Sequence, residues 1–209
     1  MSVRSFAAGS LLARLLLAGF LLVAVAGCAR RGPDSGEPLP KLGAVTFALT
    51  DQNDKPFGAD QLTGKVWAAA FMFTRCPTVC PLMTARMAHV QKLARERDVP
   101  LALLSFSVDP GHDTPEVLRA FARERGLDTS NWVFLTGDSA AVRETAERGF
   151  KIGVEGSADP SAEHYGITHG THLVLLDRQR SIRGYYQSTD DERVEALLSD
   201  AARLVAERP

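Results

Sequence analysis

Cysteine is scarce in this chain of 209 residues, occurring only at positions 28, 76 and 80. A small exported domain that depends on disulfides usually carries several cysteine pairs, and three cysteines do not make such a framework for a chain of this size. The domain therefore has to be stabilised by a hydrophobic core. The two cysteines that lie close together, Cys76 and Cys80, are then available for chemistry.

An excess of positive charge is also absent, because 24 basic residues stand against 25 acidic ones. Nucleic-acid binding normally needs a basic surface, so we predict no nucleic-acid partner. Internal repeats and low-complexity tracts are lacking as well. A single domain is the expectation that follows.

The chain begins with an apolar run, residues 15–25, that is too short to span a bilayer, which takes roughly 20 residues. Arg4 and Arg14 precede this run and the small residues Ala26 and Gly27 follow it, which is the layout of a secretory signal. The ending Val-Ala-Gly-Cys resembles a bacterial lipobox, in which the cysteine becomes the lipidated first residue of the mature protein. The alternatives are an ordinary cleaved signal or an uncleaved anchor, with Cys28 incidental.

We therefore predict a lipoprotein signal peptide at residues 1–27 and a lipid on Cys28. The mature protein would be anchored to the periplasmic face of the inner membrane in a bacterial cell envelope. Removal of the signal takes away two arginines and no acids, which leaves 22 basic and 25 acidic residues. Residues 28–41 contain three prolines and no apolar periodicity, which predicts a flexible tether. One domain, residues 42–209, remains.

Strand and helix patterns alternate along this domain. Residues 66–74 and 101–108 are apolar runs of the kind found in strands buried on both faces. Further strands are expected at residues 45–50, 132–135, 172–176 and 182–186. Helices are expected at about 77–97, 114–126 and 139–148. A final helix is expected after residues 189–192, which have a capping-box pattern. This order predicts an α/β fold, a thioredoxin-like sandwich with a central mixed sheet flanked by helices.

Cys76 and Cys80 stand where the strand at 66–74 ends and the next helix begins. Residues four apart share one face of a helix, and the unpaired N–H groups and positive dipole of a helix start favour thiolates over thiols. Two adjacent thiolates can close a disulfide or bind a soft metal ion such as Cu(I).

Three histidines, His164, His169 and His172, lie just before or at the start of the strand at 172–176. In a thioredoxin-like sheet, the loop that enters this strand faces the cysteine-bearing helix start. Two thiolates and one neutral imidazole form a set of ligands that suits Cu(I) and can adapt to Cu(II).

With these residues the chain resembles the Sco/SenC copper-binding proteins of cytochrome oxidase assembly. Residues 76–81, Cys-Pro-Thr-Val-Cys-Pro, match the Cys-Pro-x-x-Cys-Pro motif of that family. Residues 107–110, Ser-Val-Asp-Pro, and 113–116, Asp-Thr-Pro-Glu, support the match, as does a histidine eight residues before Asp177. The resemblance covers nearly the whole mature domain.

The resemblance implies copper as the bound metal, with Cys76, Cys80 and His169 as its ligands. It implies a metallochaperone that receives copper from an upstream donor protein and delivers it to the binuclear copper site of cytochrome c oxidase. The family often has Asp-His-Ser around its histidine, whereas this chain has Thr-His-Gly at 168–170. The support that this acid gives the histidine is therefore missing here. His172 is the alternative ligand, and strand geometry argues against both histidines binding together, because positions i and i+3 face opposite sides.

Two other functions compete with copper delivery. A thiol–disulfide oxidoreductase would use Cys76 as the attacking thiol and Cys80 as the resolving thiol. Two observations argue against it: three residues separate the cysteines, whereas Cys-x-x-Cys enzymes have two, and the redox reaction gives His169 no role. The two functions could coexist. A peroxiredoxin-like peroxidase is suggested by Thr74-Arg75-Cys76, but the proline expected upstream is absent.

Several nearby residues have simpler interpretations. Met83 and Met87 are expected in the core, and His89 and His112 at the surface. Asp109 either supports the site or begins a turn, and Arg75 either lowers the pKa of a cysteine or faces solvent.

Overall fold

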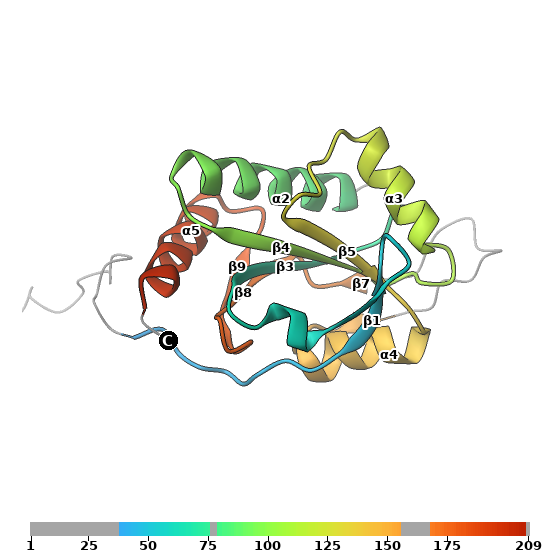
Figure 1. Ribbon diagram of the computed structural model, residues 1–209, viewed down its shortest axis with the longest axis horizontal. Coiled ribbons are helices and arrows are strands. Elements are labelled where there is room, and N and C mark those ends of the chain that lie inside the picture. The colour runs from blue at the N-terminus through green and yellow to red at the C-terminus, as the bar shows by residue number, and fades with distance from the viewer. Residues whose placement is uncertain (1–37, 76–78, 156–167, 208–209) are drawn as a thin grey trace, which may run out of the picture. The chain divides into compact units, whose positions relative to one another are not determined.

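The computed structural model describes residues 38–75, 79–155 and 168–207 (Figure 1). Pro38–Pro209 forms one compact unit, and the predicted signal peptide lies outside the described residues, as does Cys28. Within the described ranges, the longest helices are too short or too polar to cross a membrane.

The centre of this unit is a mixed sheet in which the described strands follow the order β2-β1-β5-β4-β3-β8-β9. The two middle strands, β3 (Val66–Met72) and β4 (Leu101–Ser107), are parallel and buried along their whole length. Their side chains are nearly all apolar, so both faces of the sheet have to be covered by other elements. β5 (Trp132–Thr136) continues the parallel pairing beside β4.

Antiparallel strands complete both edges of the sheet. β8 (His172–Leu176) pairs with β3, and β9 (Ile182–Gln187) pairs with β8, as the predicted hairpin requires. At the other edge, β1 (Ala48–Asp51) pairs with β5 and forms a hairpin with β2 (Pro56–Gly58). The sequence predicts only a turn where β2 lies, because three residues followed by the short helical turn η1 (Ala59–Leu62) give no periodic signal.

Helices cover the sheet on both faces. α2 (Val79–Glu96) and α3 (Pro115–Glu124) lie on one side, and α4 (Ser139–Glu144) lies on the opposite side (Figure 1). α5 (Asp191–Ala206) packs against α2 and β9. The buried faces of Met83 and Met87, each 1% exposed, belong to the hydrophobic core, which confirms the simpler interpretation of these methionines. This layered arrangement is the predicted thioredoxin-like sandwich.

The helix ends differ from the predictions in two places. The N-cap of α5 is Asp190, whose carboxylate accepts the N–H groups of Glu192 and Arg193, instead of Thr189 as the capping-box pattern suggests. The predicted helix at 139–148 is present, but after α4 it widens into a π-helical turn, η2 (Thr145–Gly149). The N-cap of α3 is Thr114, whose hydroxyl oxygen accepts the N–H of Val117.

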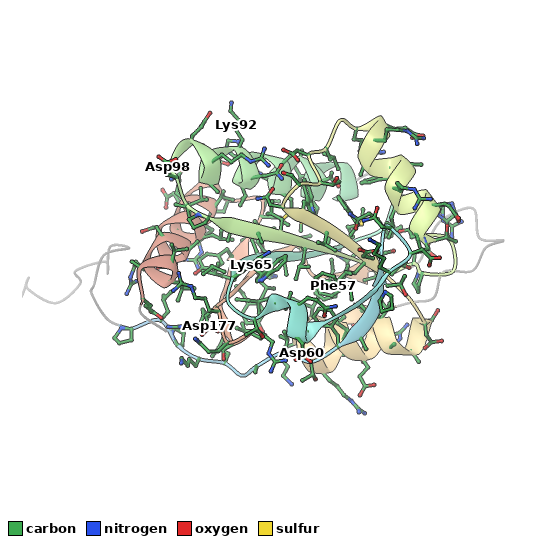
Figure 2. The ribbon with its side chains drawn as sticks, in the orientation of Figure 1. Phe57, Asp60, Lys65, Lys92, Asp98 and Asp177 are labelled. Atoms are coloured by element: carbon green, nitrogen blue, oxygen red, sulfur yellow. The ribbon has the colours of Figure 1, made fainter. Side chains whose placement is uncertain are left out.

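Residues 38–41 are the described part of the predicted tether. From Leu39 onward, they are hydrogen-bonded to the domain. The guanidinium of Arg183, which is 3% exposed, donates to the carbonyl groups of Leu39 and Pro40 at 2.9 and 3.1 Å. The same group pairs with the carboxylate of Asp177 (labelled in Figure 2) at 3.0 Å and with that of Glu207. The domain therefore begins about three residues earlier than predicted, because a buried arginine in β9 needs these carbonyl acceptors.

Candidate metal centre

The cysteine motif lies between the end of β3 and the start of α2. Phe73, Thr74 and Arg75 continue the chain beyond β3, and Cys76 lies outside the described residues. Cys80 is the second residue of α2, so its backbone occupies the first turn of that helix, as predicted. A helix start offers unpaired N–H groups and a positive dipole, which stabilise a thiolate.

His169 lies beside Phe73, the first residue after β3 and the third residue before Cys76. Its ring contacts the ring of Phe73, with centroids 5.9 Å apart and planes at 79°. The histidine belongs to β7 (Thr168–His169), which pairs with β6 (Val154–Glu155) in a small second sheet. Strands of two residues have no recognisable sequence pattern, so these two were not predicted. The position of His169 at the end of β3, however, agrees with the prediction.

A backbone carbonyl fixes which nitrogen of His169 carries the proton. Nδ1 lies 3.1 Å from the carbonyl oxygen of Gly170. A carbonyl only accepts hydrogen bonds, so this contact requires a proton on Nδ1 and leaves the lone pair on Nε2. Histidines that bind metals commonly have their second nitrogen oriented in this way. The backbone carbonyl of Gly170 thus supplies an orienting contact to the ring of His169.

Burial lowers the pKa of His169 below the ordinary histidine value of about 6.5, and the contact with Gly170 partly opposes this effect. The folded protein therefore takes up a proton on this imidazole at lower pH than the unfolded chain does. Stability owed to the neutral ring is fully present above about pH 6.5 and decreases as the pH falls from there towards the folded pKa.

We expect the metal-free protein to lose more stability than a His169→Gln variant between pH 7.5 and 5.5. Urea unfolding at both pH values measures this difference. Equal losses of stability in the two proteins would show that His169 does not take up its proton at a lower pH in the folded state than in the unfolded state.

The other histidines occupy different surroundings. His172 is the first residue of β8, half-buried and opposite Gln187 of β9. His89 is exposed on α2, as predicted. The side chain of His112 is 38% exposed, in line with the prediction of a surface residue, and its Nδ1 lies 2.9 Å from a carboxylate oxygen of Asp113. His164 lies outside the described residues.

Arg75 forms an ion pair with Asp109, the residue that follows β4 and its adjoining Val108. Two guanidinium nitrogens lie 2.9 and 2.8 Å from Oδ2 of Asp109, whose side chain is completely buried. The other oxygen of Asp109, Oδ1, has no hydrogen-bond partner among the described residues. Asp109 begins a turn, as one interpretation predicted, because its carbonyl accepts the N–H of His112 at 3.1 Å. Its side chain also binds Arg75, so Arg75 does not simply face solvent.

Asp113, the first residue of the Asp-Thr-Pro-Glu segment, makes several hydrogen bonds near the motif. Its carboxylate accepts the backbone N–H of Thr74 at 2.9 Å and the hydroxyl group of the same residue. It also accepts the hydroxyl of Ser107 and contacts His112. The sequence signal was weak, because Asp-Thr-Pro before a helix is fully explained by capping.

The ligand atoms of Asp109, His112 and Asp113 all lie within 4.8 Å of one another. This distance alone would allow a metal ion to bind. The carboxylate of Asp113, however, already accepts four contacts, and that of Asp109 faces the positive charge of Arg75. The three residues therefore form a hydrogen-bonded cluster beside the motif.

Comparisons with known proteins agree with this arrangement. The SCO1/SenC family model matches residues 37–206. The SCO1 protein homolog of Bacillus subtilis is 32% identical over 186 residues, which are 88% of this chain and 93% of that protein.

Solved structures with the same fold include that of a SCO1/SenC family lipoprotein from Bacillus anthracis, with a TM-score of 0.72 and 39% sequence identity. The match covers 82% of this chain and 100% of the Bacillus anthracis chain. A second is BsSco, a member of the Sco family of cytochrome c oxidase assembly proteins in which a disulfide switch has been identified. It has a TM-score of 0.71 at 28% identity, with 82% of this chain and 100% of its own covered. With its family model matched over nearly the whole compact unit, the chain belongs to the SCO1/SenC family.

Proposed function

We propose that this chain binds one copper ion through Cys76, Cys80 and His169 and delivers it to the binuclear copper site of cytochrome c oxidase. The observation that carries the proposal is the contact between His169 and Phe73, because Phe73 precedes Cys76 by only three residues. Chain segments nearly a hundred residues apart thus bring an imidazole to the cysteine motif. Two sulfurs and one nitrogen form a ligand set that suits Cu(I) and accommodates Cu(II).

Copper delivery requires that a partner can reach the site. Leu82 lies two residues after Cys80 and is 44% exposed. This exposed apolar side chain next to the cysteine motif is the observation from which we place the docking contact. We propose that the copper-bearing subunit of the oxidase docks here and that an upstream donor protein loads the site.

Two observations support a proposal for the cellular position. The Bacillus anthracis protein is a lipoprotein, and residues 25–28 of this chain resemble a lipobox. We propose that Cys28 carries a lipid and places the domain at the periplasmic face of the inner membrane. Attachment of the chain to the domain at Leu39 would leave about ten residues as tether.

A second function, thiol–disulfide exchange, is favoured by the position of Cys80 in the first turn of α2, where a thiolate is stabilised. A disulfide switch in the relative BsSco is consistent with it. In this role the thiolate of Cys76 attacks one sulfur of a partner's disulfide and forms a mixed disulfide. Cys80 then attacks the Cys76 sulfur, which releases the reduced partner and leaves Cys76 and Cys80 oxidised.

One experiment separates these functions. The chain without residues 1–27 is loaded with copper and mixed with the metal-free, reduced soluble domain of an oxidase copper subunit. After separation, we expect copper on the oxidase domain, and we expect none there when the Cys80→Ser variant is taken through the same loading step. If the metal stays on wild-type protein, while its reduced form reduces the oxidised oxidase domain, thiol exchange is the function.

A further inference from the structure

The two residues that precede Cys76 are both bound by one loop. This loop connects β4 to α3, runs from Ser107 to Asp113, and contributes two buried carboxylates. Asp113 accepts two hydrogen bonds from Thr74, and Asp109 pairs with the side chain of Arg75. The loop therefore holds Thr74 and Arg75, the two residues from which the chain continues into the cysteine motif.

Asp113 also joins this entry point to the neighbouring strand. Its side chain is 0% exposed, and it binds Thr74 beyond the end of β3 and Ser107 at the end of β4. A buried carboxylate is costly unless its oxygens accept several hydrogen bonds, and such charge-assisted bonds are short and strong. Asp113 meets this requirement with neutral donors and His112, whereas the buried carboxylate of Asp177 is paired with Arg183.

The bond from the backbone N–H of Thr74 limits where the next residues can go. A carboxylate that fixes this N–H and the hydroxyl of the same side chain holds Thr74 at two points. Cys76 follows two residues later in the sequence, so the contacts that hold Thr74 also limit where the chain can enter the motif. Outer contacts of this kind typically change metal affinity by about 10- to 100-fold when they are removed.

We propose that Asp113 is a positioning residue for Cys76, acting through Thr74, and that it sets both the copper affinity and the disulfide equilibrium of the Cys76–Cys80 pair. The copper part of this inference rests on the proposed ligand role of the two cysteines. The disulfide part does not, because the pair can be oxidised and reduced without metal.

Thr74 provides a matched pair of variants. Thr74→Val keeps the shape of the side chain and the backbone N–H but removes the hydroxyl that donates to Asp113. Thr74→Ser keeps that hydroxyl. Asp113→Asn removes the negative charge. It also replaces one carboxylate oxygen, which accepts hydrogen bonds, by an NH2 group, which donates them.

Asp177→Asn is the control for general destabilisation. Asp177 is a buried carboxylate as well, and it organises the turn after β8, at the opposite end of that strand from His172. Its replacement is expected to lower stability without reaching the cysteine motif.

The experiment measures two quantities for each variant of the chain without residues 1–27: the equilibrium constant of the Cys76–Cys80 disulfide in dithiothreitol redox buffers, and Cu(I) affinity in competition with a chelator. We expect Asp113→Asn and Thr74→Val to weaken copper binding at least about ten-fold. They should change the disulfide constant by a similar factor, about 30 mV for a two-electron couple. Thr74→Ser and Asp177→Asn should stay within about two-fold of wild type.

The inference is overturned if Thr74→Val and Asp113→Asn leave the disulfide constant at the wild-type value, or change it no more than Asp177→Asn does. Should Asp113→Asn fail to fold, Thr74→Val against Thr74→Ser still decides. If wild-type protein binds no copper, the proposed function fails and the disulfide constants alone decide the role of Asp113.

Discussion

Replacing His169 by alanine is expected to weaken Cu(I) binding of the reduced protein by more than about 100-fold, beyond the usual cost of losing an outer contact. The substitution removes the imidazole that lies against Phe73 and leaves only the two sulfurs of the proposed ligand set. The Cys76–Cys80 disulfide should still form, because neither sulfur needs the imidazole for oxidation. Chelator competition measures the affinity, and thiol counting measures the disulfide.

His172→Ala is the matched control for this prediction. His172 lies three residues further along the chain, is half-buried, and occupies the first position of β8. We expect its replacement to leave copper affinity close to the wild-type value. The ligand assignment is wrong if His172→Ala abolishes binding while His169→Ala preserves it.

Arg183→Met is expected to lower the free energy of unfolding by about 3–5 kcal/mol, the cost of breaking a buried ion pair by removing one partner. The guanidinium is the cation paired with the buried carboxylate of Asp177. It also donates to the carbonyl groups of Leu39 and Pro40, so its loss should detach the start of the domain. Urea unfolding at neutral pH measures the change.

The control for Arg183 is an exposed ion pair in the same region. Arg180 lies 2.6 Å from Asp60, whose side chain is 95% exposed. Exposed pairs contribute at most about 1 kcal/mol, so Arg180→Met should have a small effect. If both variants lose the same stability, the buried arginine does not hold the segment at Leu39 as the structure indicates.

Sequence patterns predicted the central part of the fold, because its elements are long and uniform. β3 and β4 are apolar along most of their length, and α2 begins at the cysteine motif with a helical pattern behind it. Short elements were missed. β6 and β7 have two residues each, so the small sheet that positions His169 leaves no trace in the sequence.

Long-range contacts account for the rest of what the sequence did not reveal. Thr74 and Asp113 are 39 residues apart, and no local pattern shows that one binds the other. Arg75 and Asp109, 34 residues apart, each had two plausible interpretations until the parallel pairing of β3 and β4 brought their ends together. Local sequence thus predicted where the cysteines lie, and tertiary structure shows what holds the chain around them.

The central claim, that this chain is a copper carrier, is tested most directly by titrating the reduced protein without residues 1–27 with Cu(I) under anaerobic conditions. We predict one copper ion bound per chain in competition with a chelator, and no such binding by Cys76→Ser or Cys80→Ser variants. Reduced wild-type protein that binds no copper, yet reduces a disulfide substrate, would contradict the claim.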